Sequence, residues 1–132
     1  MIYPYPIAIS AGGVPLKSLP DEILKLLPLT ASSFFVLFAL ADGDKHGYRI
    51  MQEIETLSNG NVRMGLATLY TTIQKFVDQA LITEVLAKTP DRKRTYRLTR
   101  LGKQLLQAEF HRQHNVLQLA RARNIFSSEG NA

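Results

Sequence analysis

The stretch DRKRTYRLTRLGKQLL, from Asp91 to Leu106, holds the residues whose types and spacing are best suited to chemistry. Four cations stand around Tyr96 in this stretch, namely Arg92, Lys93, Arg94 and Arg97. Guanidinium and ammonium groups bind phosphate oxygens through charge-assisted hydrogen bonds. Between residues 60 and 112, ten Lys or Arg stand against four Asp or Glu, although the formal net charge of the whole chain is only +5. Such a concentration fits either a polyanionic partner or a hairpin tip that is merely solvated.

Catalytic and metal-binding patterns are weak in this sequence. The chain has no cysteine, which excludes disulfides, thiolate zinc sites and cysteine nucleophiles and fits a reducing cytoplasm, where we expect the protein to be. The serines form no nucleophile-elbow pattern, and no Gly-rich phosphate loop is present. His111 and His114 are spaced three apart, but with only Glu109 nearby they give thin support for a metal site. We therefore expect no enzymatic activity, no cofactor and no metal ion.

The first 28 residues have the character of an N-terminal extension. Five prolines interrupt them, and we predict an arm that is partly disordered, with a short helix between residues 18 and 27 where Asp21 and Glu22 favour a helix start. The opening residues lack the positive end of a secretory signal. The most apolar run, Leu29 to Ala41, is too short to cross a bilayer, so we expect no membrane association.

The next two helices are predicted from apolar spacing and from stop signals. The first covers residues 30–44 and can be capped by Thr30 or Ser32. Its stretch from Phe34 to Ala41 is apolar on every side, which predicts that a partner subunit covers part of it. The second helix occupies residues 45–60 and ends at an Asn-Gly pair.

A third helix within residues 62–82 is the most informative element. Its apolar side follows the helical period and is formed by Leu66, Leu69, Ile73, Phe76 and Val77. The opposite face is small, hydroxylated and amide-bearing, and is almost free of bulky aliphatic side chains. It consists of Thr68, Tyr70, Thr71, Gln74, Lys75 and Asp78.

The remaining elements are a hairpin and a long helix. Strands are expected at residues 82–87 and 94–98, with a turn at Pro90-Asp91 and with Tyr96 and Leu98 directed inward. Thr99 then caps a helix that runs to about residue 125, which is roughly 40 Å long and exceeds what so small a domain needs. Its apolar stripe must pack on something, most economically a second copy of itself. The stripe consists of Leu106, Phe110, Val116, Leu117 and Ala120.

Three helices followed by a charged hairpin are typical of a winged helix-turn-helix, which is a mainly α fold with a small β-hairpin (α+β). We predict four segments: an extension (residues 1–28), a winged-helix DNA-binding domain (29–98), a C-terminal dimerisation helix (99–126) and a disordered tail (127–132). In such a fold the polar face of the third helix enters the major groove of double-stranded DNA, while cations on the hairpin hold phosphates.

The predicted DNA contacts follow from that placement. His46 is expected to be a loop or capping residue, whereas Tyr48 either packs in the core or contacts a phosphate. The full set of predicted DNA-binding residues is Tyr48, Arg63, Thr68, Tyr70, Thr71, Lys75, Lys88, Arg92, Lys93 and Arg94. Two alternatives stay open: a winged-helix protein-interaction module that binds no specific DNA, and a winged helix that binds RNA.

Three blocks of the sequence, DGDKHGYRIMQEIE, ATLYTTIQKFVDQALI and DRKRTYRLTRLGKQLL, resemble the PadR-like family of transcriptional regulators. In that family the blocks read approximately as HGY, GTLYPxLxxLExxGLI and RxYYxLTxxG. Two departures stand out. The Pro of GTLYP is Thr71 here, which changes the groove face. The Gly that closes the third helix is Ala80, so the exit from that helix is expected to differ.

The resemblance implies a homodimeric bacterial regulator, usually a repressor, that binds a roughly palindromic operator. It also implies that the last helix of one subunit packs on the first long helix of the other, and some relatives bind an aromatic effector at that interface. The capture of an effector by a tryptophan, as in one relative, is unsupported because this chain has no Trp. The interface residues expected on this basis are Phe34, Phe38, Leu106, Phe110 and Leu117.

Overall fold

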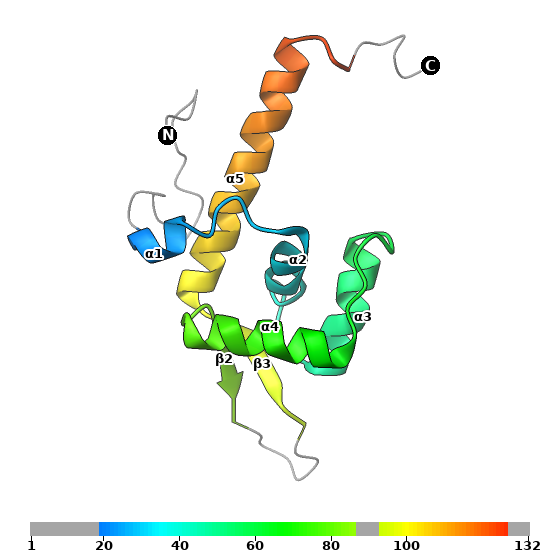
Figure 1. Cartoon of the computed structure of the whole chain (residues 1–132), viewed down its shortest axis with the longest axis vertical. Coiled ribbons are helices and arrows are strands. Elements are labelled where there is room, and N and C mark those ends of the chain that lie inside the picture. Colours follow the sequence, from blue (N-terminus) through cyan, green and yellow to red (C-terminus); the bar gives the residue numbers. More distant parts are fainter. Residues whose placement is uncertain (1–18, 87–92, 127–132) are drawn as a thin grey trace.

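The computed structural model describes residues 19–86 and 93–126 (Figure 1). The elements in these residues are, in order, α1 (Asp21–Leu24), α2 (Ala31–Ala39), β1 (Lys45–His46), α3 (Gly47–Leu57), α4 (Leu66–Asp78), β2 (Ile82–Val85), β3 (Thr95–Leu98) and α5 (Arg100–Ala122). The predicted winged helix with a long C-terminal helix is confirmed, although α5 ends three residues before the expected position. The first 18 residues of the predicted extension (1–28), the predicted tail (127–132) and the turn at Pro90-Asp91 lie outside the described residues. No helix in the described part is long and apolar enough to cross a membrane.

The small sheet is antiparallel and has three strands in the order β1-β3-β2. Ile82 pairs with Leu98 at one end of the hairpin and Val85 pairs with Thr95 at the other. Tyr96 and Leu98 are buried, as their alternate spacing predicted. The sequence analysis missed β1, because a strand of two residues that pairs Lys45 with Tyr96 has no periodicity to detect.

The core is built around α2. Val36, Leu37 and Ala39 are fully buried, because α3, α4 and α5 of the same chain contact this helix. In Figure 1, α2 lies between α3 and α5, with α4 crossing beneath it. The all-round apolar character of this helix is therefore largely satisfied within one chain, and only Phe35 and Phe38 remain half-buried.

Side-chain caps set the start of three helices. The hydroxyl of Thr30 accepts a hydrogen bond from the N–H of Ser33 at 3.1 Å, and that of Thr99 accepts one from Gly102 at 3.0 Å. At α3, Nδ1 of His46 accepts the N–H of Arg49 at 3.3 Å. The caps predicted at Thr30 and Thr99 and the capping role of His46 are confirmed.

A buried carboxylate on α5 is held mainly by neighbours on the same helix. Glu109 is only 1% exposed, and its two oxygens accept hydrogen bonds from the Arg112 guanidinium at 2.8 and 2.9 Å. Gln113 donates a further bond at 3.0 Å, and the N–H of Leu29 lies 3.5 Å away. Burial raises the pKa of Glu109, but the bonds from Arg112 and Gln113 lower it by more. The carboxylate is therefore charged in the core, and its contribution to stability is lost only as the pH falls through this depressed pKa.

The exit from α4 keeps a left-handed cap although glycine is absent. The N–H of Leu81 bonds the carbonyl of Phe76 at 2.9 Å, and the N–H of Ala80 bonds that of Val77 at 3.0 Å. Ala80 has a φ of 62°, so an alanine takes the left-handed conformation that glycine adopts most easily. The expectation of a different exit is wrong, since these two bonds hold the alanine in place.

The start of α5 is attached directly to this exit, at a junction formed by Ala80, Leu81, Thr99 and Gly102. The N–H of Thr99 bonds the Leu81 carbonyl at 3.0 Å, and the Thr99 hydroxyl donates to the Ala80 carbonyl at 2.7 Å. A β-carbon added to Gly102 would lie 2.2 Å from the Leu81 carbonyl oxygen. Only glycine allows this approach of helix to backbone.

We predict that Ala80→Gly stabilises the protein. An alanine in the left-handed conformation costs about 1–2 kcal/mol, which glycine would relieve. Glycine also gives the unfolded chain more conformational freedom, which offsets part of that relief. The free energy of unfolding should therefore rise by about 0.5–1 kcal/mol. Urea unfolding followed by circular dichroism measures the change. Ala67→Gly in the right-handed backbone of α4 is the control and should lose stability instead. A loss in both variants would contradict the strained cap.

Candidate nucleic-acid interface

The solvent face of α4 is the polar surface that the sequence predicted. Leu69, Ile73 and Phe76 turn into the core, and the opposite side is exposed. Ala67 and Thr71, four residues apart, run along the middle of that side. The exposed face consists of Ala67, Thr68, Tyr70, Thr71, Gln74, Lys75 and Asp78. In Figure 1, α4 crosses the domain on the side from which the β2–β3 wing projects.

Hydrogen bonds within α4 limit what this face can offer to a ligand. The hydroxyl of Thr71 donates to the carbonyl of Ala67, and that of Thr72 donates to the carbonyl of Thr68, both at 3.0 Å. The amide of Gln74 donates to Asp78 at 2.9 Å. Sequence spacing placed these side chains on one face, but it could not reveal that several of their donors are already used.

Tyr70 is held in position by a glycine of the preceding helix. A β-carbon on Gly47 would lie 2.3 Å from the Tyr70 hydroxyl, so the ring rests directly on the start of α3. The centroid of the Tyr70 ring lies 6.4 Å from that of buried Tyr96. Tyr70 remains 39% exposed, so its ring lies against α3 at the surface and is not enclosed in the core.

The wing brings a cation next to the same tyrosines. Arg94 hydrogen-bonds Tyr96 and lies 3.8 Å from the Glu84 carboxylate on the neighbouring strand, and both contacts raise the pKa of Arg94. Burial raises the pKa of Tyr96. Lys93 is exposed beside them. The predicted contacts Lys88 and Arg92 lie outside the described residues.

Arg97, which belongs to the same cationic stretch, has a structural role. Its guanidinium donates to both oxygens of Asp44 at 2.9 and 2.8 Å, which raises the pKa of Arg97 and fastens β3 to the loop before β1. Three other predicted contacts are exposed. Arg63 pairs with Glu55 at 2.8 Å in the connection between α3 and α4, Lys75 lies on the α4 face, and Tyr48 is 53% exposed. The core alternative for Tyr48 is therefore wrong.

The far part of α5 carries a second exposed surface, and this one is apolar. Phe110 and Leu117 are 37% and 39% exposed, and Val116 and Leu119 are more exposed still. The Phe110 ring contacts Phe34 and Phe38 edge-on, with centroids 5.3 and 5.1 Å apart. Of the residues expected at an interface, Phe34 and Leu106 are buried in the core of the single chain, which leaves little of either for a partner.

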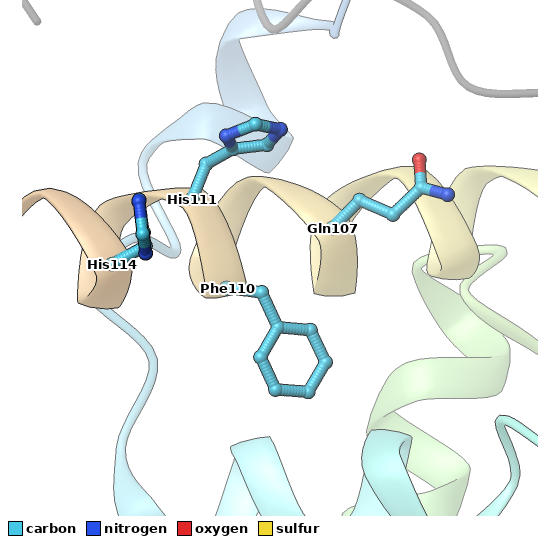
Figure 2. Close-up of a pocket in the computed structure, with 4 residues that line it drawn as sticks. All are labelled: Gln107, Phe110, His111 and His114. Carbon is cyan, nitrogen blue, oxygen red and sulfur yellow. The ribbon is translucent and has the colours of Figure 1, made fainter. Parts of the chain in front are cut away.

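His111 and His114 lie beside this apolar surface. With Gln107 and Phe110 they line a shallow depression on α5. Figure 2 shows that Phe110 points away from His111, to the other side of the helix. Among the described residues there is no group of three or more side chains that could hold a metal ion.

The fold and the exposed α4 face beside a cationic wing define the class of winged-helix regulators. Residues 36–108 match the family described as the Transcriptional regulator PadR-like family, and the chain belongs to that family. Its members are regulators of transcription and not enzymes. The resemblance that the three sequence blocks suggested is thereby confirmed.

Three similar proteins show how far the likeness extends. An uncharacterized 37.1 kDa protein in a transposon of Streptomyces fradiae is 36% identical over 80 residues; the match covers 61% of this chain but only 22% of that protein. A transcriptional regulator from Clostridium thermocellum shares the fold with a TM-score of 0.56 and 19% identity, over 83% of this chain and 100% of that one. Bacillus subtilis PadR, solved in complex with operator DNA, has a TM-score of 0.54 and 24% identity, over 61% of this chain and 47% of its own.

We predict that Gly47→Ala displaces the Tyr70 ring. The added β-carbon overlaps only the far end of a side chain, so the ring should swing outward at a cost of about 1 kcal/mol in stability. Nuclear Overhauser effects between the ring protons of Tyr70 and the backbone protons of residue 47 measure the displacement. Gly65→Ala is the control, because nothing lies within 4 Å of its added β-carbon. An unmoved Tyr70 ring in Gly47→Ala would contradict the contact.

Proposed function

We propose that this protein is a sequence-specific DNA-binding repressor that acts as a homodimer on a roughly palindromic operator. The observation that carries the proposal is the juxtaposition of the small polar α4 face with a cationic wing. A recognition helix needs short side chains to approach base edges, and a wing needs cations to hold the backbone. Both requirements are met on one side of the molecule.

The individual roles follow from position. Thr68, Thr71 and Lys75 lie on the α4 face and would meet the major groove, while Tyr70, anchored on Gly47, would reach a phosphate at the groove edge. Backbone contacts would come from the ends of the surface and from the wing. They are assigned to Tyr48, Arg63, Lys88, Arg92, Lys93 and Arg94.

Dimerisation is assigned to α5, which makes residues 29–98 the DNA-binding unit and residues 99–126 the dimerisation unit. This helix has 23 residues, and exposed apolar side chains continue along it beyond the contacts that bury its first turns. A two-fold dimer would present two α4 helices to successive major grooves, which requires a palindromic site. Repression would be steric, because an occupied operator excludes polymerase.

The deciding experiment selects duplexes from a random pool with the full-length protein and compares the best sequence with a random duplex by fluorescence anisotropy. We expect a preference of about a thousandfold or more. Equal binding to both duplexes would contradict sequence-specific regulation. Absence of binding at low salt would favour the alternative of a winged-helix module that binds proteins.

We predict that Lys93→Ala, at an exposed cation assigned to the phosphate backbone, weakens DNA binding and flattens its salt dependence. Each lost phosphate contact should lower the log–log salt slope by about one unit. Anisotropy titrations at several salt concentrations measure the slope. Arg97→Gln is the control, because it removes one positive charge whose guanidinium is already bonded to Asp44. The salt slope of this variant should change far less. Equal changes in the two variants would mean that only overall charge matters.

We predict that Leu117→Glu dissociates the dimer. A charge in the middle of the apolar α5 stripe would be buried without a partner in the dimer, at a cost of several kcal/mol. Sedimentation equilibrium at micromolar concentration should show a monomer. Leu86→Glu, at an 89% exposed position that follows β2, is the control and should stay dimeric. A dimeric Leu117→Glu variant would exclude the α5 stripe as the interface.

A further inference from the structure

Thr71 occupies the position on α4 that a DNA groove would meet most closely. It is exposed, with Ala67 one turn before it and Lys75 one turn after it on the same side. Ala67 carries only a methyl group, so no long side chain precedes Thr71 on this line. The backbone of α4 can therefore approach base edges at these two residues.

The hydroxyl proton of Thr71 is already used. It is donated to the Ala67 carbonyl at 3.0 Å, which turns the hydroxyl back along the helix. What Thr71 can still offer is its γ-methyl group and its oxygen lone pairs. The neighbouring amide of Gln74 donates one of its two N–H groups to Asp78, so part of the nearest polar donor is also occupied.

The major-groove edges of the bases contain one apolar group, the 5-methyl of thymine. The methyl groups of Ala67 and Thr71, one turn apart, together form an apolar contact surface that fits this group. The alternative is that the Thr71 oxygen accepts a hydrogen bond from a base amino group. Such a bond would not involve the methyl groups of Ala67 and Thr71.

We propose that Thr71, supported by Ala67, determines operator specificity by contacting the 5-methyl group of one thymine in each half-site. This inference rests on the proposed function, because it assumes that α4 lies in the major groove. The removal of one methyl group from water changes an affinity by about fourfold, so each contact should contribute a discrimination of that order.

The test uses the full-length protein and the duplex selected from a random pool. Each thymine is replaced singly by deoxyuridine, which lacks only the methyl group, and anisotropy gives the change in Kd. At one position per half-site Kd should rise about fourfold. Thr71→Ser, which keeps the hydroxyl but lacks the methyl, should bind both duplexes equally, and Thr71→Val should still prefer thymine.

The matched control is Thr72→Ser. Thr72 forms the same hydrogen bond to the residue four positions earlier, but it is half-buried at the side of the face, so its serine variant should keep the thymine preference. If the selected duplex is bound tightly and no thymine is sensitive, the methyl contact is overturned while the repressor stands. If Thr71→Ser keeps the preference for thymine over deoxyuridine and Thr71→Val loses it, the Thr71 oxygen, and not its methyl group, determines the specificity. That result would also overturn the inference. Absence of any preferred duplex would overturn both proposals.

Discussion

The rest of the structure depends on the close approach of Gly102 to the carbonyl of Leu81. No side chain fits between them, and the N–H of Thr99 bonds the same carbonyl. At this point α4 has just ended, β2 begins, β3 has just returned and α5 starts. One tight contact therefore sets the angle between the helix that would read DNA, the wing beside it and the helix that would join two subunits.

The surface at the start of α4, at the other end of that helix, is ordered by packing more than by ion pairs. Tyr70 rests on Gly47 and lies near Tyr96, which joins α3, α4 and the wing through side chains that are close to the core. The cations at the edge have carboxylate neighbours, as with Arg94 and Glu84. Exposed pairs of this kind contribute only about 0–1 kcal/mol.

Much of the fold was readable from the sequence, because its helices and hairpin have strong periodicities and recognisable caps. The apolar sequence of α2 also predicted that this helix is buried. Periodicity could not distinguish burial by the same chain from burial by a partner subunit. Glu109 was missed as a structural residue because a Glu followed three positions later by Arg is equally typical of a solvated helix face. For the site, spacing predicted which side chains share a face. It could not reveal the contact between Gly47 and Tyr70 or the occupied hydroxyl of Thr71, which arise only when the elements are in place.

Because α5 is long, a small tilt at its fixed end produces a large displacement at its far end. Its first turn is fixed at the junction by the Thr99 cap and the Leu81 carbonyl, and its other end extends past the domain. A helix of 23 residues is about 34 Å long. A tilt of about 5° at the fixed end would move the far end by about 3 Å, close to the rise of one base pair along DNA. In the proposed dimer, such a tilt would change the spacing of the two α4 helices by close to one base-pair step.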